Sequence, residues 1–263
     1  MSSLRPFWRY FGAKWRSAPR YPAPAHDTIV EPFAGAAGYA LRYPDRRVVL
    51  VERYAVVAAV WRYLIAVRPD ELRAIPAVEC VDDLPSWVPQ EARWLIGLRF
   101  GAGDSRPRTR VSPMVRRDGG FEVAAIADQV ERIRHWTIIE GDYTLAPDVV
   151  ATWFVDPPYQ IAGSRNRAPG QRGRVRYPHG GDAIDFAALG AWTAARRGQV
   201  IACENVGATW LPFAPFGRRS SAAPGRFHDE AIWTRGIGDD PQEIEALRAE
   251  LVAAHRAKTE PTP

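Results

Sequence analysis

The sequence has few cysteines and no long apolar run. Its 263 residues include two cysteines, Cys80 and Cys203, which are too few for a disulfide framework and fit a reducing cytoplasm. No stretch reaches the roughly 18 consecutive apolar residues that a membrane-spanning helix needs. The first ten residues are basic and aromatic, and they lack the apolar core of a secretion signal. We therefore expect a cytoplasmic protein without a membrane partner.

Metal-binding patterns are also missing from the sequence. The five histidines are scattered, and no Cys-x-x-Cys or His-Glu-x-x-His spacing occurs. We therefore expect neither a structural nor a catalytic metal, since such sites draw their ligands from closely spaced residues of these types. A composition of 46% hydrophobic and 25% charged residues suits one globular domain with an insertion, or two small domains.

The net charge of +5 is distributed unevenly along the chain. Arginine supplies nearly all of the positive charge, because the whole chain contains two lysines. Residues 1–24, 99–117 and 157–181 together carry 16 basic residues and a single acidic one, Asp104. Such segregation is what a phosphate-binding surface needs, although a solvated loop is the alternative for each stretch taken alone.

Strand-like and helix-like patterns alternate along most of the chain. Short apolar runs predict strands at residues 28–31, 48–52, 137–140, 151–155 and 199–203, with 210–213 and 231–234 as candidates to close the sheet. Helical spacing predicts helices at 56–65 and 186–197, and an amphipathic stretch holds Ile126, Val130 and Ile133. A cap, a proline and an acid predict a helix start at 240–243. This alternation indicates an α/β fold, with a mostly parallel sheet and helices on both sides.

One region breaks the alternation. Residues 85–131 are rich in proline, glycine, arginine and tryptophan and show no clear strand–helix period. We interpret them as an insertion into a catalytic domain, whose two parts are then residues 1–84 and 132–263.

A four-residue turn, Asp156-Pro157-Pro158-Tyr159, directly follows the expected strand at 151–155. The two prolines have no N–H groups, so they cannot extend a sheet ladder and their carbonyls remain able to accept a hydrogen bond from a ligand. Asp156 adds a carboxylate at the strand end, and Tyr159 adds a flat face on which a base could stack. Together these groups fit the binding of an aromatic amine. The simpler interpretation is a strand that stops at a proline turn, with Asp156 as a turn residue.

A second motif lies where the first expected strand meets the following segment. Residues 31–38 read Glu-Pro-Phe-Ala-Gly-Ala-Ala-Gly, and small residues at such a point let the backbone approach a ligand closely. The spacing is not Gly-x-Gly-x-x-Gly, so a dinucleotide is not specifically indicated. Glu52 ends the next strand, 14 residues beyond Gly38, where an acid can accept hydrogen bonds from both hydroxyls of a ribose. An ordinary solvated strand end is the alternative for Glu52.

These motifs together resemble those of a known enzyme family. Gly12-Ala13-Lys14, the glycine turn at 31–38 and the Asp-Pro-Pro-Tyr turn occur in the order seen in Dam-type (D12 class) adenine-specific DNA methyltransferases. The strings at 90–97 (QEARWLIG) and 204–213 (ENVGATWLPF) resemble bacteriophage-like members more narrowly. The resemblance spans nearly the whole chain. It implies S-adenosylmethionine as cofactor and a seven-stranded Rossmann-like methyltransferase sheet carrying a small target-recognition insertion.

The resemblance also implies roles for individual residues. Glu52 matches the acid that holds the cofactor's ribose, although this acid is usually Asp. Asp156 matches the acid between cofactor and substrate. Asp142 and Tyr143 resemble the acid–aromatic pair that borders the adenosine pocket, although Asp142 could equally cap a turn. The residues expected to bind the cofactor are Tyr10, Gly12, Lys14, Glu31, Phe33, Gly35, Gly38, Glu52, Asp142 and Asp156.

The implied reaction is direct transfer of a methyl group to the exocyclic amine of adenine in double-stranded DNA. Asp156 and the carbonyl of Pro157 would accept the two amine hydrogens and orient the nitrogen lone pair. The amine is inaccessible inside a duplex, so the base would be flipped out and stacked on Tyr159. These three residues are the expected catalytic group, and no covalent intermediate is required.

Arginines are the expected DNA contacts. The insertion at 85–131 is predicted to recognise the target sequence, because arginine suits bidentate contact with guanine. Phosphate contact or plain solvation is the alternative for each of these side chains. The basic loop that follows the Asp-Pro-Pro-Tyr turn is predicted to clamp phosphates. The residues concerned are Arg93, Arg99, Arg116, Arg165, Arg172, Arg174 and Arg176.

Two other functions remain open at this point. Related proline–aromatic motifs also act on RNA bases, so an RNA adenine methyltransferase is one alternative. The other is a non-catalytic DNA-binding remnant, although a remnant would have no chemical need for Asp156. A monomer is expected, since enzymes of this class often act as monomers.

Overall fold

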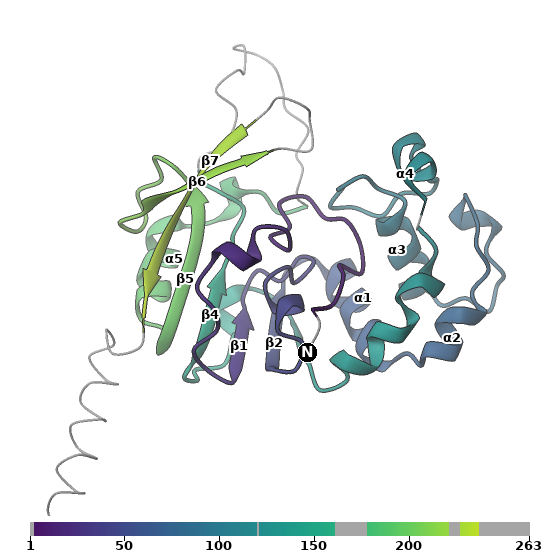
Figure 1. The fold of residues 1–263 in the computed structure, drawn as a ribbon, viewed down its shortest axis with the longest axis horizontal. Coiled ribbons are helices and arrows are strands. Elements are labelled where there is room, and N and C mark those ends of the chain that lie inside the picture. The colour runs from purple at the N-terminus through teal and green to yellow at the C-terminus, as the bar shows by residue number, and fades with distance from the viewer. Residues whose placement is uncertain (1–2, 120, 161–177, 221–226, 237–263) are drawn as a thin grey trace, which may run out of the picture.

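The computed structural model describes residues 3–119, 121–160, 178–220 and 227–236. At its centre lies a seven-stranded sheet with the strand order β3-β2-β1-β4-β5-β7-β6 (Figure 1). The strands are β1 (Thr28–Glu31), β2 (Arg47–Glu52), β3 (Thr137–Glu140), β4 (Ala151–Val155), β5 (Gly198–Asn205), β6 (Ala214–Ser220) and β7 (Phe227–Arg235). The structure is therefore the mixed α/β fold that the alternating pattern predicts, with a sheet of Rossmann-like arrangement.

The strands β1 to β5 run parallel, and β7 runs antiparallel to both β5 and β6. From β1 the chain first builds outward through β2 to β3, and it then returns to place β4 on the other side of β1. Strand order thus reverses between β1 and β4. In open α/β sheets, ligands bind beyond the carboxyl ends of the strands at such a point.

Both faces of the sheet are buried, which explains the continuous apolar runs in the sequence. Side chains alternate between the faces, so Val48 and Leu50 of β2 pack into one hydrophobic cluster while Val49 and Val51 pack into the other. The first cluster includes α1 and the N-terminal segment, and the second includes α5. The predicted core residues Trp61, Trp153, Phe154 and Cys203 are buried, and Trp192 packs against the second cluster.

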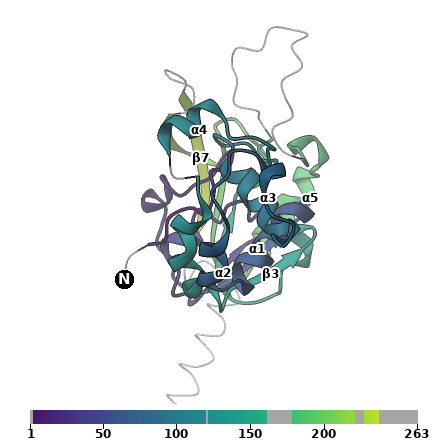
Figure 2. The same ribbon diagram turned by 90° about the vertical axis from the view of Figure 1, so that its right-hand side faces the viewer.

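The α-helices of the described residues are α1 (Ala55–Ala66), α2 (Pro69–Ala74), α3 (Gln90–Arg99), α4 (Pro113–Asp118) and α5 (Phe186–Ala194). Short 3₁₀ helices lie in the connections: η1 (Ala18–Arg20), η2 (Ala40–Arg42), η3 (Val81–Asp83), η5 (Tyr143–Leu145) and η6 (Gly181–Ala183). Figure 2 looks onto α2, α3 and α4, which lie together at the end of the molecule away from β6 and β7 (Figures 1 and 2).

The structure confirms most elements expected from the sequence and corrects three. The amphipathic stretch forms an 11-residue 3₁₀ helix, η4 (Val123–Ile133), and α5 ends three residues before the predicted end at residue 197. Residues 210–213 are not a strand, because Pro212 has no N–H and Phe213 closes a turn onto the carbonyl of Leu211, 2.8 Å away. The last strand pair forms instead from β6 and β7. The helix start predicted at 240–243 lies outside the described residues.

The segment interpreted as an insertion, residues 85–131, packs into the same hydrophobic cluster as α1. Leu95 and Leu98 of α3, Val115 of α4 and Ile126 of η4 are all buried there. A shared hydrophobic core therefore joins this segment to the rest of the protein. The boundaries of the insertion, at residues 85 and 131, stay a prediction.

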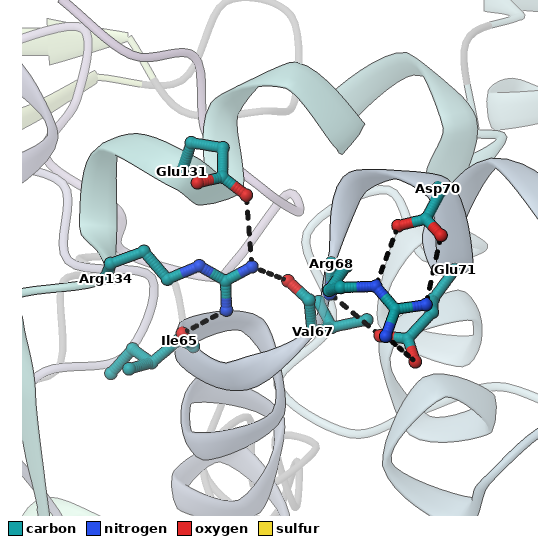
Figure 3. Close-up of polar contacts among 7 residues, drawn as sticks. All are labelled: Ile65, Val67, Arg68, Asp70, Glu71, Glu131 and Arg134. Carbon is teal, nitrogen blue, oxygen red and sulfur yellow. Dashed lines mark hydrogen bonds and ion pairs between the residues drawn. The ribbon is translucent and has the colours of Figure 1, made fainter.

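Arginine side chains fix the connections between the helices beside the sheet (Figure 3). Arg134 donates hydrogen bonds to the carbonyls of Ile65, at 2.7 Å, and Val67, which the last turn of α1 leaves without helical partners. Arg68, held extended by the proline that follows it, pairs with Asp70 at 3.0 Å, and its N–H donates to Glu71 at 2.9 Å. These contacts end α1 and start α2 within three residues.

No helix within the described ranges combines the length and the apolar composition that crossing a bilayer requires.

Candidate active site

A cavity of about 230 Å³ lies at the carboxyl ends of β1, β2 and β4, beside the point where strand order reverses. Glu31, Glu52 and Asp156 stand at or directly after these three strand ends and line it. All ten residues that the sequence assigns to a cofactor line this one cavity: Tyr10, Gly12, Lys14, Glu31, Phe33, Gly35, Gly38, Glu52, Asp142 and Asp156. They come from five separate parts of the chain.

The glycine turn after β1 makes room for the N-terminal segment. A Cβ at Gly38 would lie 2.6 Å from the backbone nitrogen of Trp15 and 2.7 Å from that of Lys14, so only glycine allows this approach. Gly35 has a positive φ of 46°, and its carbonyl accepts a hydrogen bond of 2.8 Å from the indole of Trp61 on α1. The turn therefore brings Lys14 to the cavity and is itself fixed by the core.

Glu52, at the end of β2, is held by backbone donors. Its Oε2 accepts the N–H of Gly35 at 2.9 Å, and its Oε1 accepts the N–H of Tyr54 at 2.8 Å. Burial raises the pKa of Glu52, and these hydrogen bonds oppose the rise. Each carboxylate oxygen has a second lone pair, so Glu52 can still accept hydrogen bonds from a ligand in the cavity.

Glu31, at the end of β1, is a buried acid that also lines the cavity. Its side chain is almost fully enclosed, and Oε1 accepts the N–H of Ala40 at 2.6 Å, at the start of η2. Burial raises the pKa of Glu31 to about 8, and the charge of Asp156 adds to the rise while the hydrogen bond from Ala40 opposes it.

Lys14 and Asp156 form an ion pair in the lining of the cavity. The ammonium of Lys14, whose side chain is 3% exposed, contacts Oδ1 of Asp156, which is 17% exposed. The same ammonium donates to the carbonyl of Gly12 at 3.2 Å and lies 4.9 Å from the centre of the Tyr159 ring. Lys14 thereby connects the N-terminal segment to the turn that follows β4.

The Asp-Pro-Pro-Tyr turn presents only some of its residues to the cavity. Asp156 and Pro158 line it, whereas Pro157 is buried and Tyr159 packs against the hydrophobic core. The hydroxyl of Tyr159 donates to Glu230 Oε1 on β7 at 3.4 Å, and burial raises the pKa of Tyr159 well above its usual value. The ring predicted to stack on a base therefore lies beside the cavity, next to Lys14.

Six aromatic side chains line the cavity, and two of them stack on each other. Phe33, after β1, stacks on Tyr143 with ring centres 5.4 Å apart and an interplanar angle of 29°. Tyr143 is the aromatic member of the acid–aromatic pair that the resemblance places beside an adenosine pocket, and it lines the cavity. Asp142 does cap a turn, since its Oδ1 accepts the N–H of Thr144 at 3.2 Å, and it also lines the cavity.

Acidic side chains outnumber basic ones around the cavity. Five acids line it, against Lys14, Arg53 and the histidine His179. The fifth acid is Asp185, which sequence reasoning missed. Asp185 caps α5 by accepting the N–H groups of Ala187 and Ala188, each at 3.0 Å. Even with Glu31 protonated at neutral pH, the other four acids exceed Lys14 and Arg53 in charge, so the cavity offers a net negative environment, which favours a cationic ligand.

Two of the arginines assigned to DNA are structural, which corrects that prediction. Arg93 donates four hydrogen bonds of 2.6–3.1 Å to carbonyls of residues 81–88. Arg99 is 8% exposed and donates to the carbonyls of Phe7, Phe121 and Glu122, and burial lowers its pKa to about 10. Their donors are directed into the protein, so neither guanidinium can reach a nucleic acid without breaking these contacts.

Other arginines of the same region are exposed. Arg116 is 56% exposed and pairs with Glu79 at 2.6 Å. The exposed set of this basic surface is Arg106, Arg108, Arg110, Arg116 and Arg117. Arg106 lies close enough to Tyr54, a cavity residue, to oppose the burial-driven rise of its pKa. Arg165, Arg172, Arg174 and Arg176 lie outside the described residues.

Within the described ranges, no three or more His, Cys, Asp or Glu side chains gather in a way that could hold a metal ion.

Comparison with known proteins leaves the fold as the main guide. No protein-family model matches the sequence, and no curated protein matches it. One solved structure that is similar is a conserved hypothetical protein from Streptococcus pyogenes, with 11% sequence identity and a TM-score of 0.35. The match covers 81% of this chain and 88% of that one.

Proposed function

We propose that the protein is an S-adenosylmethionine-dependent methyltransferase that modifies the exocyclic amine of adenine in DNA. The observation that carries the proposal is the convergence of three motifs on one cavity. The glycine turn after β1, the acid that ends β2 and the acid that follows β4 all line it. The proposal joins this convergence to the resemblance of the same motifs to Dam-type enzymes.

The residues of the cavity fit the proposed cofactor. Glu52 has acceptor capacity for ribose hydroxyls, and Phe33 with Tyr143 offers an aromatic wall for an adenine ring. The excess of carboxylates suits a sulfonium cation. When bound, S-adenosylmethionine would supply an activated methyl group.

The chain's own part in the reaction is to orient an amine. Asp156 is positioned by Lys14, and its carboxylate would accept one hydrogen of the target amine while a proline carbonyl of the turn accepts the other. Fixing the amine in this way aligns its lone pair, and alignment of this kind can contribute about 7–11 kcal/mol to lowering a barrier. Tyr159, tethered to Glu230, would serve as a fixed platform beside a flipped base.

Double-stranded DNA is the proposed substrate, and the exposed arginines at 106–117 are its proposed contacts. Five exposed guanidinium groups on one segment supply the positive surface that phosphate binding needs. This assignment replaces the predicted contacts of Arg93 and Arg99.

The proposal can be tested in cells. The protein is expressed in a host lacking adenine methylation, and the host DNA is sequenced by a method sensitive to modified bases. We expect methylated adenine within one short sequence, and none with Asp156→Ala. Asp148→Asn is the matched control, because Asp148 is 72% exposed and does not line the cavity. Methylation of ribosomal RNA instead of DNA would favour an RNA enzyme, and no methylation of either would contradict the proposal.

A further inference from the structure

Another buried acid, Glu204, contacts the residue that follows the Asp-Pro-Pro-Tyr turn. It stands near the carboxyl end of β5, is fully enclosed, and does not line the cavity. Its Oε2 accepts the N–H of Gln160 at 2.7 Å and the indole N–H of Trp210 at 3.1 Å. Its Oε1 accepts the N–H of Asn205 at 2.8 Å.

The contact to Gln160 follows from the chemistry of the turn. The ladder between β4 and β5 ends at the pair Val155 and Ala202. Pro157 and Pro158 have no N–H to continue it, so the backbone of β5 cannot hold the turn in the usual way. Glu204, two residues beyond the last pair, takes the N–H of Gln160 with its side chain instead.

A second hydrogen bond joins Gln160 to the loop that follows β5. The N–H of Thr209, in the loop after β5, donates to the side-chain carbonyl of Gln160 at 3.0 Å. Gln160 is therefore bonded through both its backbone and its side chain, to Glu204 and to the loop that carries Trp210. The residue directly after Tyr159 is fixed in this way to β5 and not to the cavity.

Burying a carboxylate costs free energy unless hydrogen bonds compensate for the lost water. Three N–H donors compensate Glu204. None of the hydrogen bonds described for this carboxylate comes from a charged side chain. Burial raises the pKa of Glu204, and the hydrogen bonds from Asn205, Gln160 and Trp210 oppose the rise. An apolar residue would avoid this cost, so the acid has a specific task.

We infer that Glu204 is a positioning residue, which holds the turn from Asp156 to Tyr159 in place through the N–H of Gln160. The anchor itself is a property of the fold. Its consequence for methyl transfer rests on the proposed function. A displacement of about 1 Å at a reacting group can cost on the order of 100-fold in rate, so a small loosening of the turn has a measurable effect.

The first test measures the anchor without any reaction. Hydrogen exchange of the Gln160 amide is followed by NMR in the wild type and in two variants. Glu204→Gln keeps the shape but replaces one acceptor oxygen with an NH₂ group that faces N–H donors. Trp210→Phe removes a different donor from the same carboxylate and keeps the carboxylate that accepts the Gln160 N–H. We expect a protected amide in the wild type, exchange at least ~10-fold faster in Glu204→Gln, and little change in Trp210→Phe.

The second test measures the consequence. For Glu204→Gln we expect kcat for DNA methylation to fall about 10- to 100-fold, with the Kd for S-adenosylmethionine within about twofold of wild type. Trp210→Phe should keep kcat within about threefold of wild type, even if it loses as much thermal stability as Glu204→Gln or more. A purely structural role for Glu204 would make kcat follow stability in both variants.

The outcomes separate the two proposals. A Gln160 amide that exchanges freely in the wild type overturns the anchor, even if Glu204→Gln fails to fold. Equal losses of kcat in the two variants overturn the positioning role. If the wild-type protein methylates no nucleic acid, the proposed function fails, and the exchange measurements still decide whether Glu204 holds the turn.

Discussion

Lys14 and Asp156 lie 142 residues apart in the sequence and form an ion pair in the lining of the cavity. The lysine side chain is 3% exposed and the aspartate 17% exposed, so water screens the pair weakly. Buried pairs of this kind are costly to break, because the remaining partner is left as an uncompensated charge. The pair therefore joins two parts of the proposed active site and makes each depend on the other.

A double-mutant cycle tests this dependence. We expect Lys14→Met to lower the free energy of unfolding by about 3–5 kcal/mol, because Asp156 loses its partner. Adding Asp156→Asn should restore part of that loss, since the stranded charge is then removed. Urea unfolding of the two single variants and the double variant measures the coupling. Strictly additive losses would show that the two side chains do not interact.

The buried acid Glu31 predicts a pH dependence of stability. Its pKa is about 8 in the folded protein, against 4.5 for an unperturbed glutamate. Between these values the folded protein binds a proton that the unfolded chain has released. The free energy of unfolding therefore falls as the pH rises through this window, by up to ~1.4 kcal/mol per pH unit.

Glu31→Gln is the matched variant for this prediction. The amide cannot titrate, and its carbonyl can still accept the N–H of Ala40. Denaturant unfolding from pH 5 to pH 8 should show the wild type losing stability relative to the variant. A difference between the two proteins that stays constant over this range would contradict the raised pKa.

The two glycines Gly180 and Gly181 test how closely the Asp-Pro-Pro-Tyr turn is packed. A Cβ at Gly181 would lie 2.6 Å from the carbonyl oxygen of Tyr159 and 3.2 Å from that of Pro158, so alanine must change the contact between residue 181 and the turn. At Gly180 the nearest atom, at 2.5 Å, is the end of the Asp182 side chain, which can rotate away.

We expect Gly181→Ala to reduce methyl transfer at least ~10-fold, because the turn carries Asp156. Gly180→Ala should leave transfer near the wild-type rate. Initial rates with saturating cofactor and DNA compare the two variants directly. Equal rates in both would mean that the close approach of Gly181 has no bearing on the site.

The exposed arginines predict the salt dependence of DNA binding. Neutralising Arg106, Arg110 and Arg117 together to glutamine should weaken binding and reduce the slope of log K against log salt concentration by up to about three. Fluorescence anisotropy with a labelled duplex measures the slope. Arg73→Gln on α2 is the control, since Arg73 pairs with Asp128 and lies on an element outside the basic surface. An unchanged slope in the triple variant would remove this surface from the proposed interface.

The elements that carry the site could be predicted from the sequence for a physical reason. Parallel strands buried on both faces read as continuous apolar runs, so β1, β2 and β4 can be recognised in the sequence by their composition. Their ends mark where polar ligand-binding groups gather, which is why Glu31, Glu52 and Asp156 were predicted to share one site. The edge strand β6 was harder to predict from the sequence, because Pro212 interrupts the strand expected at 210–213 and β6 begins only at Ala214.

Contacts between distant residues could not be predicted in the same way. Arg93 and Arg99 have the composition of DNA contacts, and only the fold shows that backbone carbonyls surround their guanidinium groups. Glu204 looks like any acid at a strand end, because its partner Gln160 lies 44 residues earlier in the chain. Tyr159 was expected to face a base, and its position is set by Lys14 and Glu230.

Methyl transfer by the purified protein tests the central claim most directly. The protein is incubated with S-adenosylmethionine carrying a labelled methyl group and with duplex DNA, and the DNA is then digested and its nucleosides are separated by mass spectrometry. We predict labelled N6-methyldeoxyadenosine with the wild type and none with Asp156→Asn, which retains the size of the side chain. Label on another base, or the same yield from Asp156→Asn, would contradict the account.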